Sequence, residues 1–558
     1  MQSMKKSVFL LSAVLLMRAV SAPACTNLIV TKGASADGSL MTTYAADSHQ
    51  LYGALKSLPA ADYPDGTMLS VYEWDTGRYL GEIPQASHTY AVIGNMNEHQ
   101  LVIGETTYGG REYIDSTAII DYGSLIYIAL QRCRTAREAI ALIDELTGRY
   151  GYASEGETFT IADTQEVWMM DIIGKAPKYD KKGVNVNKGA VWVARRIPDG
   201  YISGHANQSR ISKIDFNDPE NCLYAKDVIT HAREQGIFDG KDEDFSFCDV
   251  YNPLDFGTVR GCDARVWAFF NRFAEGMDKY VDYAMGYNFD NRMPLYVRPD
   301  HKITVKELAD MMRDHYEGTP MDMTTDIGAG GSHSPYRWRP MEFEYEGHSY
   351  INERAIATQQ TGWWYVAQCR PEKKCGGIFW FGVDDAATSP LMPFFPKYSV
   401  VPECLSEDNG SIIKYSDTSM FWAVNRIAQF AYLRYDRIGA EVRKVIDEYE
   451  NDAIKRVSEH ETMADIMIGA GESRLAGIYL DLFCTTNAKD VLNKWKELDK
   501  YLLVKYMDGN IKKQNEDGSF STNGYSDVIP EFPIQEDYSD KWKENVVRDN
   551  GDELRIPD

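Results

Sequence analysis

The chain of 558 residues is 44% hydrophobic and 12% aromatic, and it carries a formal net charge of −24. This aromatic content excludes a disordered chain, and the length is enough for one large domain or several ordinary ones. The excess of acidic groups repels phosphate backbones and anionic lipid surfaces, and no basic patch offsets it, so we expect no nucleic-acid partner. The nine cysteines are an odd number, which needs an explanation in an exported protein.

The N-terminus has the pattern of a signal peptide. Lys5 and Lys6 precede a mostly apolar run over residues 8–17, and the small residues Ala22 and Ala24 stand where a signal peptidase reads the chain. A run of about ten residues is too short to span a bilayer, and no later apolar stretch is long enough. We therefore expect a periplasmic or secreted protein without a membrane span. A buried N-terminal helix is the alternative.

Cleavage after Ala24 makes Cys25 the first residue of the mature chain. A lipoprotein acylates the sulfur and the amine of such a cysteine, whereas an N-terminal nucleophile keeps both groups free. A lipoprotein site usually has Leu followed by Ser or Ala at the positions that Ala22 and Pro23 occupy here. Residues 26–31 are rich in β-branched side chains and predict a strand where a lipoprotein usually has a flexible tether. We favour a free N-terminal cysteine over a lipid-anchored one.

The first part of the chain after this strand is also rich in predicted strands. They cover residues 89–93, 101–103, 159–162, 167–172, 191–194 and 376–383, with a hairpin involving residues 95–98 and a turn at 163–166. Thr135 and Glu138 have the spacing of a capping box, and apolar residues then recur at helical intervals. An amphipathic helix is therefore expected over residues 136–147.

Helical patterns dominate from about residue 416. Met420, Val424 and Ile427 follow helical spacing, and similar patterns continue to about residue 505 with a break at residues 469–471. The last 40 or so residues are polar and acidic, which is typical of a peripheral wrap or a partly disordered end. Strands and helices followed by a helical stretch predict an α+β protein with a mostly helical C-terminal extension.

Five segments stand in order behind the signal peptide. They read CTNLIVTKGASADGSLMTTYAAD (25–47), MNEHQLVIGETTYGG (96–110), IADTQEVW (161–168), VWVARRIPDG (191–200) and HANQSRI (205–211). Their order and wording resemble the cysteine dipeptidases of the N-terminal-nucleophile hydrolase superfamily, which are relatives of penicillin and bile-salt amidases. The resemblance covers roughly residues 25–400. It implies a four-layer αββα sandwich that hydrolyses dipeptides without a cofactor.

The resemblance divides the chain into four parts. These are a signal peptide (1–24), a catalytic domain (25–405), a helical extension packed on the core (406–515) and a polar acidic C-terminal segment (516–558). Dipeptides are the expected partners, and a homo-oligomer is compatible with the sequence.

The chemistry of an N-terminal cysteine explains why no histidine is required. A thiol and an α-amine have ordinary pKa values of about 8.5 and about 7.7–8.0, so they can share a proton near neutral pH. The sulfur of Cys25 then attacks the scissile carbonyl with its own amine as general base, and water hydrolyses the thioester. The resemblance implies that the oxyanion is held by the side-chain amide of Asn207 and a backbone N–H near Thr106 or Thr107. Asn207 also begins an N-glycosylation sequence, which is the competing interpretation.

Further site residues follow from the same resemblance. Asp47 stands where the superfamily keeps an acidic residue, but the arginine usual three positions earlier is Tyr44 here. Arg260 or Arg265 is a candidate for the missing guanidinium, and the Tyr44 hydroxyl can donate to Asp47. Glu105 is a candidate for binding the free ammonium of a dipeptide, and we group Tyr44 and Arg265 with it as substrate-binding residues. Surface ion pairs for the arginines and a solvated turn for Glu105 are the ordinary alternatives.

Three alternatives to this mechanism remain open. His205 or His49 would be the partner of the cysteine in a papain-like protease. The enzyme would instead be an amidohydrolase of N-acyl compounds, of the penicillin or bile-salt type. A non-catalytic surface lipoprotein acylated at Cys25 is the third. The sequence contains no H-E-x-x-H and no C-x-x-C motif, so no metal site is indicated.

With Cys25 set apart as the nucleophile, eight cysteines remain. An even number in an oxidising compartment allows up to four disulfides. Proximity in the chain suggests the pairs Cys369 with Cys375 and Cys248 with Cys262. All eight can equally be buried thiols.

Overall fold

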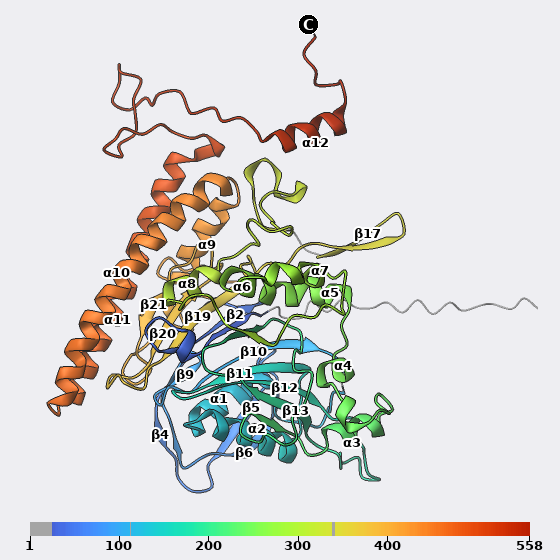
Figure 1. The fold of residues 1–558 in the computed structure, drawn as a ribbon. Helices are drawn as coiled ribbons and strands as arrows, with labels where there is room; N and C mark the ends of the chain where they lie inside the picture. The colour runs from blue at the N-terminus through green and yellow to red at the C-terminus, as the bar shows by residue number, and fades with distance from the viewer. Residues whose placement is uncertain (1–24, 112, 338–340, 558) are drawn as a thin grey trace, which may run out of the picture.

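Two antiparallel sheets form the centre of the computed structural model, which describes residues 25–111, 113–337 and 341–557 (Figure 1). The seven-stranded sheet has the order β16-β14-β1-β2-β19-β20-β21 and the eight-stranded sheet the order β15-β13-β12-β11-β10-β9-β8-β3. The seven are β1 (Asn27–Val30), β2 (Leu40–Asp47), β14 (Ile202–His205), β16 (Tyr296–Val297), β19 (Thr361–Cys369), β20 (Ile378–Val383) and β21 (Met392–Phe394). The eight are β3 (Ser57–Leu58), β8 (Val92–Ile93), β9 (Met96–Asn97), β10 (Val102–Gly109), β11 (Gly156–Ala162), β12 (Val167–Gly174), β13 (Ala190–Arg196) and β15 (Cys222–Tyr224). The expected signal peptide, residues 1–24, lies outside the described residues.

Three small ribbons and a set of helices surround the sheets. The ribbons are β4 (Ala61–Asp62) with β7 (His88–Thr89), β5 (Met68–Tyr72) with β6 (Tyr79–Pro84), and β17 (Glu342–Tyr345) with β18 (His348–Ile351). The helices are α1 (Tyr122–Arg132), α2 (Ala136–Tyr150), α3 (Val228–Glu234), α4 (Phe247–Tyr251), α5 (Phe256–Thr258), α6 (Ala264–Phe273), α7 (Val281–Ala284), α8 (Val305–Met311), α9 (Met420–Ala431), α10 (Tyr435–Gly469), α11 (Ser473–Lys505) and α12 (Asp540–Asn550).

The central strands are covered on both faces. β1 and β2 of one sheet contact β10 and β11 of the other, while α1 and α2 pack against the eight-stranded sheet and α6, α8 and α9 against the seven-stranded sheet. In Figure 1, α6 and α8 lie above the upper sheet and α1 and α2 below the lower one. Every residue of β1, β2, β11, β12, β19 and β20 is therefore buried. Burial on both faces explains why β12, β19 and β20 are nearly continuous apolar runs, whereas β2 and β11 also bury threonines and an acidic residue each.

Several predicted elements are confirmed. Strands β11 and β12 pair in antiparallel register, and the carboxylate of Asp163 accepts backbone N–H bonds from Gln165 and Glu166 in the turn between them. The helix expected over residues 136–147 is α2, whose Thr135 side chain caps the backbone of Glu138. The carboxylate of Glu138 reaches back to the N–H of Arg134 instead of Thr135, so the cap is displaced by one residue.

The stretch 89–93, expected to be one strand, is divided in the structure. Thr89 pairs with Ala61 in β7, whereas Val92 pairs with Asn97 in β8. The N–H of the intervening Tyr90 donates to a carbonyl at the end of α1, which takes it out of both ladders. Side-chain pattern alone does not show this change of partner, because both halves have strand-like residues.

The helical extension follows the sequence pattern closely. Helices α9, α10 and α11 occupy the range of helical periodicity, and the break expected at residues 469–471 is the turn between α10 and α11. This turn ends with Gly471 at a φ of 86°, a backbone conformation that suits glycine. The two long helices pack on each other and on β21 (Figure 1). Within the described ranges, no helix is long and apolar enough to cross a membrane.

All nine cysteines are free thiols in the structure, so the two suggested disulfide pairs do not form and the free-thiol alternative holds. The Sγ of Cys369 donates to the carbonyl of Gln100 at 3.2 Å, and the Sγ of Cys248 accepts from Arg292 at 3.2 Å. Each sulfur has therefore found a polar partner from a distant segment, and closeness in the chain did not bring Cys375 or Cys262 into bonding position.

A buried ion pair fastens the helical extension to the core. Arg313, just beyond α8, donates to both carboxylate oxygens of Glu450 on α10, at 2.5 and 3.2 Å, and both side chains are almost fully buried. The same guanidinium donates to the carbonyls of Ala386 and Ser389, and Glu450 also accepts from the N–H of Leu391. The pair therefore joins α8, α10 and the loop before β21.

We predict that Glu450→Ala lowers the free energy of unfolding by about 3–5 kcal/mol, because it leaves a buried guanidinium without its counter-charge. The control is Asp447→Ala, one turn earlier on α10, whose carboxylate pairs with Lys306 and Arg443 and is 41% exposed. That change is expected to cost less than about 1 kcal/mol. Urea unfolding followed by tryptophan fluorescence measures both, and equal losses would contradict the role given to the buried pair.

Candidate active site

Cys25 lies where the two sheets face each other. It directly precedes β1, is 1% exposed, and is followed by Thr26, whose backbone pairs with that of Ala45 in β2. Behind it, the side-chain amide of Asn27 donates to the carbonyl of Glu105 in β10 at 2.7 Å, which links the sheets at this point. The predicted nucleophile is thus held at the meeting of three strands.

The sulfur of Cys25 contacts one group from each sheet. It lies 3.5 Å from the hydroxyl of Tyr44 on β2 and 3.7 Å from Oε1 of Glu105 on β10. The Tyr44 hydroxyl donates to the same Oε1 at 2.5 Å, and the backbone N–H of Asp47 also hydrogen-bonds the sulfur. The expected bond from Tyr44 to Asp47 is therefore replaced by one from Tyr44 to Glu105.

This environment disfavours a thiolate. Burial raises the pKa of the Cys25 thiol well above its ordinary value, and the nearby carboxylates of Glu105 and Asp47 raise it further. The hydrogen bonds from Tyr44 and from the Asp47 backbone act in the opposite direction but are smaller effects. Because a neutral thiol is a poor nucleophile, a reaction at this sulfur needs a base close to it.

Glu105 has a second carboxyl group beside it. Burial raises the pKa of Glu105 to about 7, and the pKa of Glu157 on β11 is raised well above its ordinary value by burial and by Glu105. The two carboxyl groups lie close enough to influence each other's pKa, and Glu157 also accepts from the hydroxyl of Thr107 at 2.8 Å. Two buried carboxylates repel each other, so the pair holds a proton rather than ionising twice.

Asp47 is fully buried and its carboxylate is paired with a residue that sequence reasoning missed. Nη2 of Arg354 donates to it at 2.5 Å, and the hydroxyl of Thr361 donates at 2.6 Å. Burial raises the pKa of Asp47, and the charge of Arg354 opposes that rise. Arg354 is 307 positions from Asp47 and has no recognisable motif around it, so no local signal identified it.

The two arginines proposed from sequence have different positions. Nη1 of Arg265, on α6, donates to the carbonyl of Cys25 at 2.6 Å and to Thr26, while Nη2 donates to Oδ1 of Asn207 at 2.8 Å. The Arg265 side chain is buried against the backbone around the nucleophile. Arg260 instead donates to Glu353 and to the carbonyl of Met285, so neither arginine replaces Arg354 beside Asp47.

Asn207 and the two threonines lie beside the nucleophile's strand. The Asn207 side chain is held at both ends, since its Nδ2 donates to the carbonyl of Thr107 at 2.6 Å while its Oδ1 accepts from Arg265. The residue is 8% exposed, which disfavours the glycosylation alternative. Thr106 turns its hydroxyl to Nδ1 of His205 at 2.8 Å.

His205 does not partner the cysteine. Its Nε2 lies 2.7 Å from the hydroxyl of Thr160, so both ring nitrogens contact threonine hydroxyls. Burial lowers the pKa of His205 well below its ordinary value, and the nearby Arg210 and Arg265 lower it further. The ring is therefore neutral and structural, and the papain-like alternative loses this candidate.

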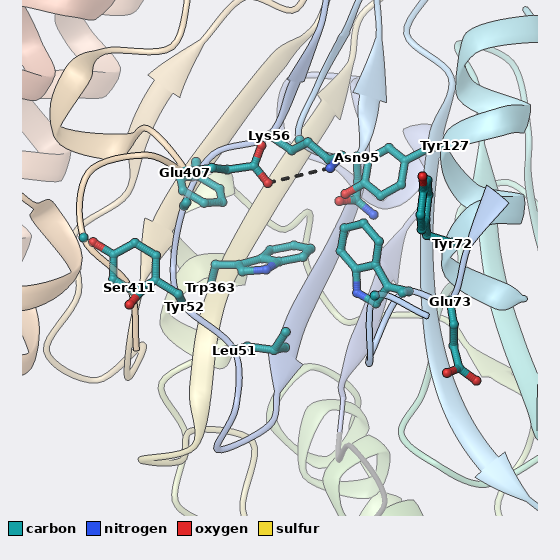
Figure 2. A pocket seen from close by; sticks show the side chains of 16 residues that line it. Leu51, Tyr52, Lys56, Tyr72, Glu73, Asn95, Tyr127, Trp363, Glu407 and Ser411 are labelled. Carbon is teal, nitrogen blue, oxygen red and sulfur yellow. Dashed lines mark ion pairs between the residues drawn. The ribbon is translucent and has the colours of Figure 1, made fainter. Parts of the chain in front are cut away.

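A pocket of about 460 Å³ opens beside this cluster (Figure 2). Trp363 of β19 lines it and packs edge-on against Tyr44, with ring centroids 5.0 Å apart. The pocket therefore begins one aromatic ring away from the residue that contacts the Cys25 sulfur.

Comparison with known proteins gives a consistent result. The model of the family described as Peptidase family C69 matches residues 24–448. A Salmonella dublin protein named "Probable dipeptidase" is 25% identical over 416 residues, covering 70% of this chain and 85% of that protein. A "Probable dipeptidase B" of Streptococcus pyogenes is 22% identical over 456 residues, covering 76% and 81%. A "Probable dipeptidase" of Latilactobacillus sakei is 22% identical over 454 residues, covering 77% and 86%.

The family match runs from the residue before Cys25 through both sheets and into α10, so it includes every residue of the cluster described above. It covers well over half of the chain. The protein is a peptidase that belongs to family C69, a family of cysteine peptidases of the N-terminal-nucleophile type.

Proposed function

We propose that this peptidase is an exported dipeptidase whose nucleophile is the sulfur of Cys25 and whose base is the α-amine of the same residue. The observation that carries the proposal is the contact of the Cys25 sulfur with Tyr44 and Glu105. The carbonyl of the same cysteine accepts a hydrogen bond from Arg265, which fixes the position of the residue. The names of the relatives support a dipeptide substrate. The arrangement of helices over both outer faces supports the four-layer αββα fold of N-terminal-nucleophile hydrolases.

Removal of the signal peptide creates the base. In the uncleaved chain the nitrogen of Cys25 is an amide and cannot accept a proton. Cleavage after Ala24 converts it to an amine attached to the same α-carbon as the thiol side chain. The surroundings raise the pKa of the thiol, so the sulfur still carries its proton before the attack. The adjacent amine takes this proton as the sulfur attacks.

The reaction then has two halves. The sulfur adds to the carbonyl carbon, the amine passes its proton to the leaving nitrogen, and the C–N bond breaks to leave a thioester. Water, deprotonated by the amine, adds to the thioester, and the thiol is restored as the acid product leaves. The side-chain amide of Asn207 and a backbone N–H near Thr106 or Thr107 are the proposed donors to the oxyanion, and loss of one such donor costs about 3–4 kcal/mol in the barrier.

Glu105 is proposed to bind the ammonium group of the substrate. Its carboxylate contacts the nucleophile, and its partner Glu157 adds a second acidic group behind it. A substrate ammonium that binds at these carboxyl groups balances their negative charge in place of the bound proton, which is released to solvent. Asp47 stays neutralised by Arg354 and helps to fix β2 around the sulfur.

Cys25→Ala is expected to reduce turnover of a dipeptide such as Ala-Phe on the order of 10⁴- to 10⁶-fold. The matched control is Cys404→Ala, which removes a partly exposed thiol outside the site and is expected to leave the rate unchanged. A ninhydrin or coupled amino-acid assay on the purified mature chains measures both. Retention of dipeptide hydrolysis by Cys25→Ala would rule out the proposed mechanism, and cleavage of N-acyl amino acids alone would favour the acylase alternative.

The mature protein is expected to begin at Cys25 and to carry no acyl group. Intact-mass spectrometry of protein recovered from an exporting host tests this. A chain that retains one residue before Cys25 is expected to be folded but inactive, because its nitrogen remains an amide. Activity in that longer chain, or a lipid mass on Cys25, would contradict the α-amine as base.

Glu105→Gln is expected to raise KM for dipeptides by about 10- to 100-fold, because an ammonium loses one charge-assisted hydrogen bond. The same change is expected to stabilise the fold. Since folding raises the pKa of Glu105 to about 7, its ionisation destabilises the folded state increasingly as the pH rises from about 4.5 through 7. The glutamine variant should therefore unfold at a higher temperature than the wild type at pH 8, with a smaller difference at pH 5.

The control for Glu105→Gln is Glu82→Gln, an exposed glutamate on β6, which should change neither property. Calorimetry at the two pH values and steady-state kinetics are the measurements. A stabilised variant with an unchanged KM would show that Glu105 is a buried acid without a role in substrate binding.

A further inference from the structure

The pocket lined by Trp363 has aromatic walls from the seven-stranded sheet, from helix α1 and from the turn between β5 and β6. Trp363 and Phe381 of the seven-stranded sheet line one side, and Trp74 and Tyr127 line the other. Trp74 stacks on Tyr127 with ring centroids 5.0 Å apart and an interplanar angle of 26°, which makes a flat and rigid wall. In Figure 2, Trp363 lies between Tyr52 on one side and the wall containing Tyr127 on the other. Such a space accepts a large apolar side chain.

One positive charge is built into this aromatic pocket. Among the described residues that line it, Lys56 is the one cation. Its Nζ lies 5.2 Å from the ring centroids of both Trp74 and Tyr127, so two cation–π contacts hold the ammonium group in place.

The carboxylate that faces Lys56 is held less firmly. Glu407 lies 3.6 Å from Nζ (Figure 2) and its side chain is 61% exposed, compared with 28% for Lys56. An ion pair of this length and exposure contributes little to stability, so another carboxylate can replace it at little cost. The lysine is therefore positioned by its aromatic contacts, and its charge is available to a ligand.

The charges of the site match the two ends of a dipeptide. Glu105 and Glu157, which the proposed function assigns to the ammonium end, lie at the nucleophile. Lys56 lies in the adjoining pocket, beyond the Trp363 ring that packs on Tyr44. A substrate attacked by Cys25 has its leaving residue on the side of the scissile bond opposite to its ammonium group. That leaving residue carries the free carboxylate of a dipeptide.

We propose that this pocket is the binding site for the C-terminal residue of the substrate. Lys56 binds the free α-carboxylate, and the aromatic walls bind the side chain, which makes large apolar and aromatic C-terminal residues preferred. The proposal rests on the dipeptidase function proposed above and adds its specificity. It also gives a reason for a limit on substrate length, because a longer peptide has an uncharged amide where Lys56 requires a carboxylate.

The experiment compares two substrates across four mature proteins. The substrates are Ala-Phe and its C-terminal amide, which differ only in the carboxylate. The proteins are the wild type, Lys56→Met, Lys56→Arg and Lys397→Met. Lys397 is the matched control, because its ammonium also lies over a tyrosine ring, at 5.4 Å from the centroid of Tyr398, but outside the pocket.

The wild type is expected to prefer the acid over the amide by about 10- to 100-fold in kcat/KM, mainly through KM. Lys56→Met should abolish that preference, because kcat/KM for the acid falls to the level of kcat/KM for the amide. Lys56→Arg should retain most of it, and Lys397→Met all of it. If Lys56→Met keeps the wild-type ratio of acid to amide, or lowers both rates equally, the carboxylate site is refuted.

A second variant tests the walls. Trp74→Leu is expected to lower kcat/KM for Ala-Phe several-fold more than kcat/KM for Ala-Ala, so that the preference for Ala-Phe falls. An unchanged preference would refute the side-chain part of the proposal. These outcomes differ from failure of the dipeptidase function itself, in which the wild type hydrolyses neither Ala-Phe nor Ala-Ala.

Discussion

The guanidinium of Arg265 is the interaction on which the arrangement of the site depends. It joins the carbonyl of Cys25, the hydroxyl of Thr26 and the side chain of Asn207, and it also binds the carbonyl of Ala206. The Arg265 side chain is 1% exposed, and a charge buried to this extent is tolerated only when its N–H groups have hydrogen-bond acceptors. The four acceptors therefore stabilise the buried arginine, and the arginine in turn fixes their positions. One side chain from α6 thereby sets the position of Cys25, the proposed nucleophile, relative to Asn207, the proposed oxyanion donor, which lies just beyond the end of β14.

Around this fixed frame the site contains more acidic groups than basic partners. Asp47 has its charge matched by Arg354, whereas among the described residues Glu105 and Glu157 lie close together without an ion pair, and burial raises the pKa of both. Such an arrangement costs stability in the free enzyme and favours the entry of a positively charged group. This is the pattern expected where a fold sacrifices stability for binding. The buried pair of Arg313 and Glu450, in contrast, is fully matched and serves only to hold the helices on the core.

The two sheets have different parts in this design. The seven-stranded sheet provides Tyr44 and Asp47 on β2 and the strand that follows Cys25, while the eight-stranded sheet provides Glu105 and Glu157. Bringing the two faces together places the acidic groups against the sulfur, and the aromatic pocket with Lys56 lies at the side of the same contact. Neither sheet alone contains a complete site, which explains why strands far apart in the chain contribute to it.

Local patterns were enough to predict a large part of the fold. The strands β11 and β12, the helix α2 and the long helices α9 to α11 follow from residue periodicity, turn residues and caps, all of which act over a few positions. The candidate residues Cys25, Tyr44, Asp47, Glu105 and Asn207 were named from short motifs, and the structure places them in one cluster. The division of the stretch 89–93 was missed, and the two suggested disulfide pairs do not form, because in both cases a distant backbone group or side chain determined the partner.

The sequence by itself determined the α+β class, identified Cys25 as the residue after the signal-peptide pattern, and revealed the family resemblance. Each of these inferences depends only on patterns within short stretches of the chain. Only the tertiary structure decided which guanidinium meets Asp47, which acid the Tyr44 hydroxyl binds, and that Glu157 lies close to Glu105. It also placed Lys56 against Trp74 and Tyr127 in the pocket that Trp363 lines. These choices depend on the register of β2 with β19 and on the contact between the two sheets. Through such contacts a side chain meets a partner that is far away in the chain, as Asp47 meets Arg354 at a separation of 307 positions. No local sequence pattern predicts a pairing over this distance.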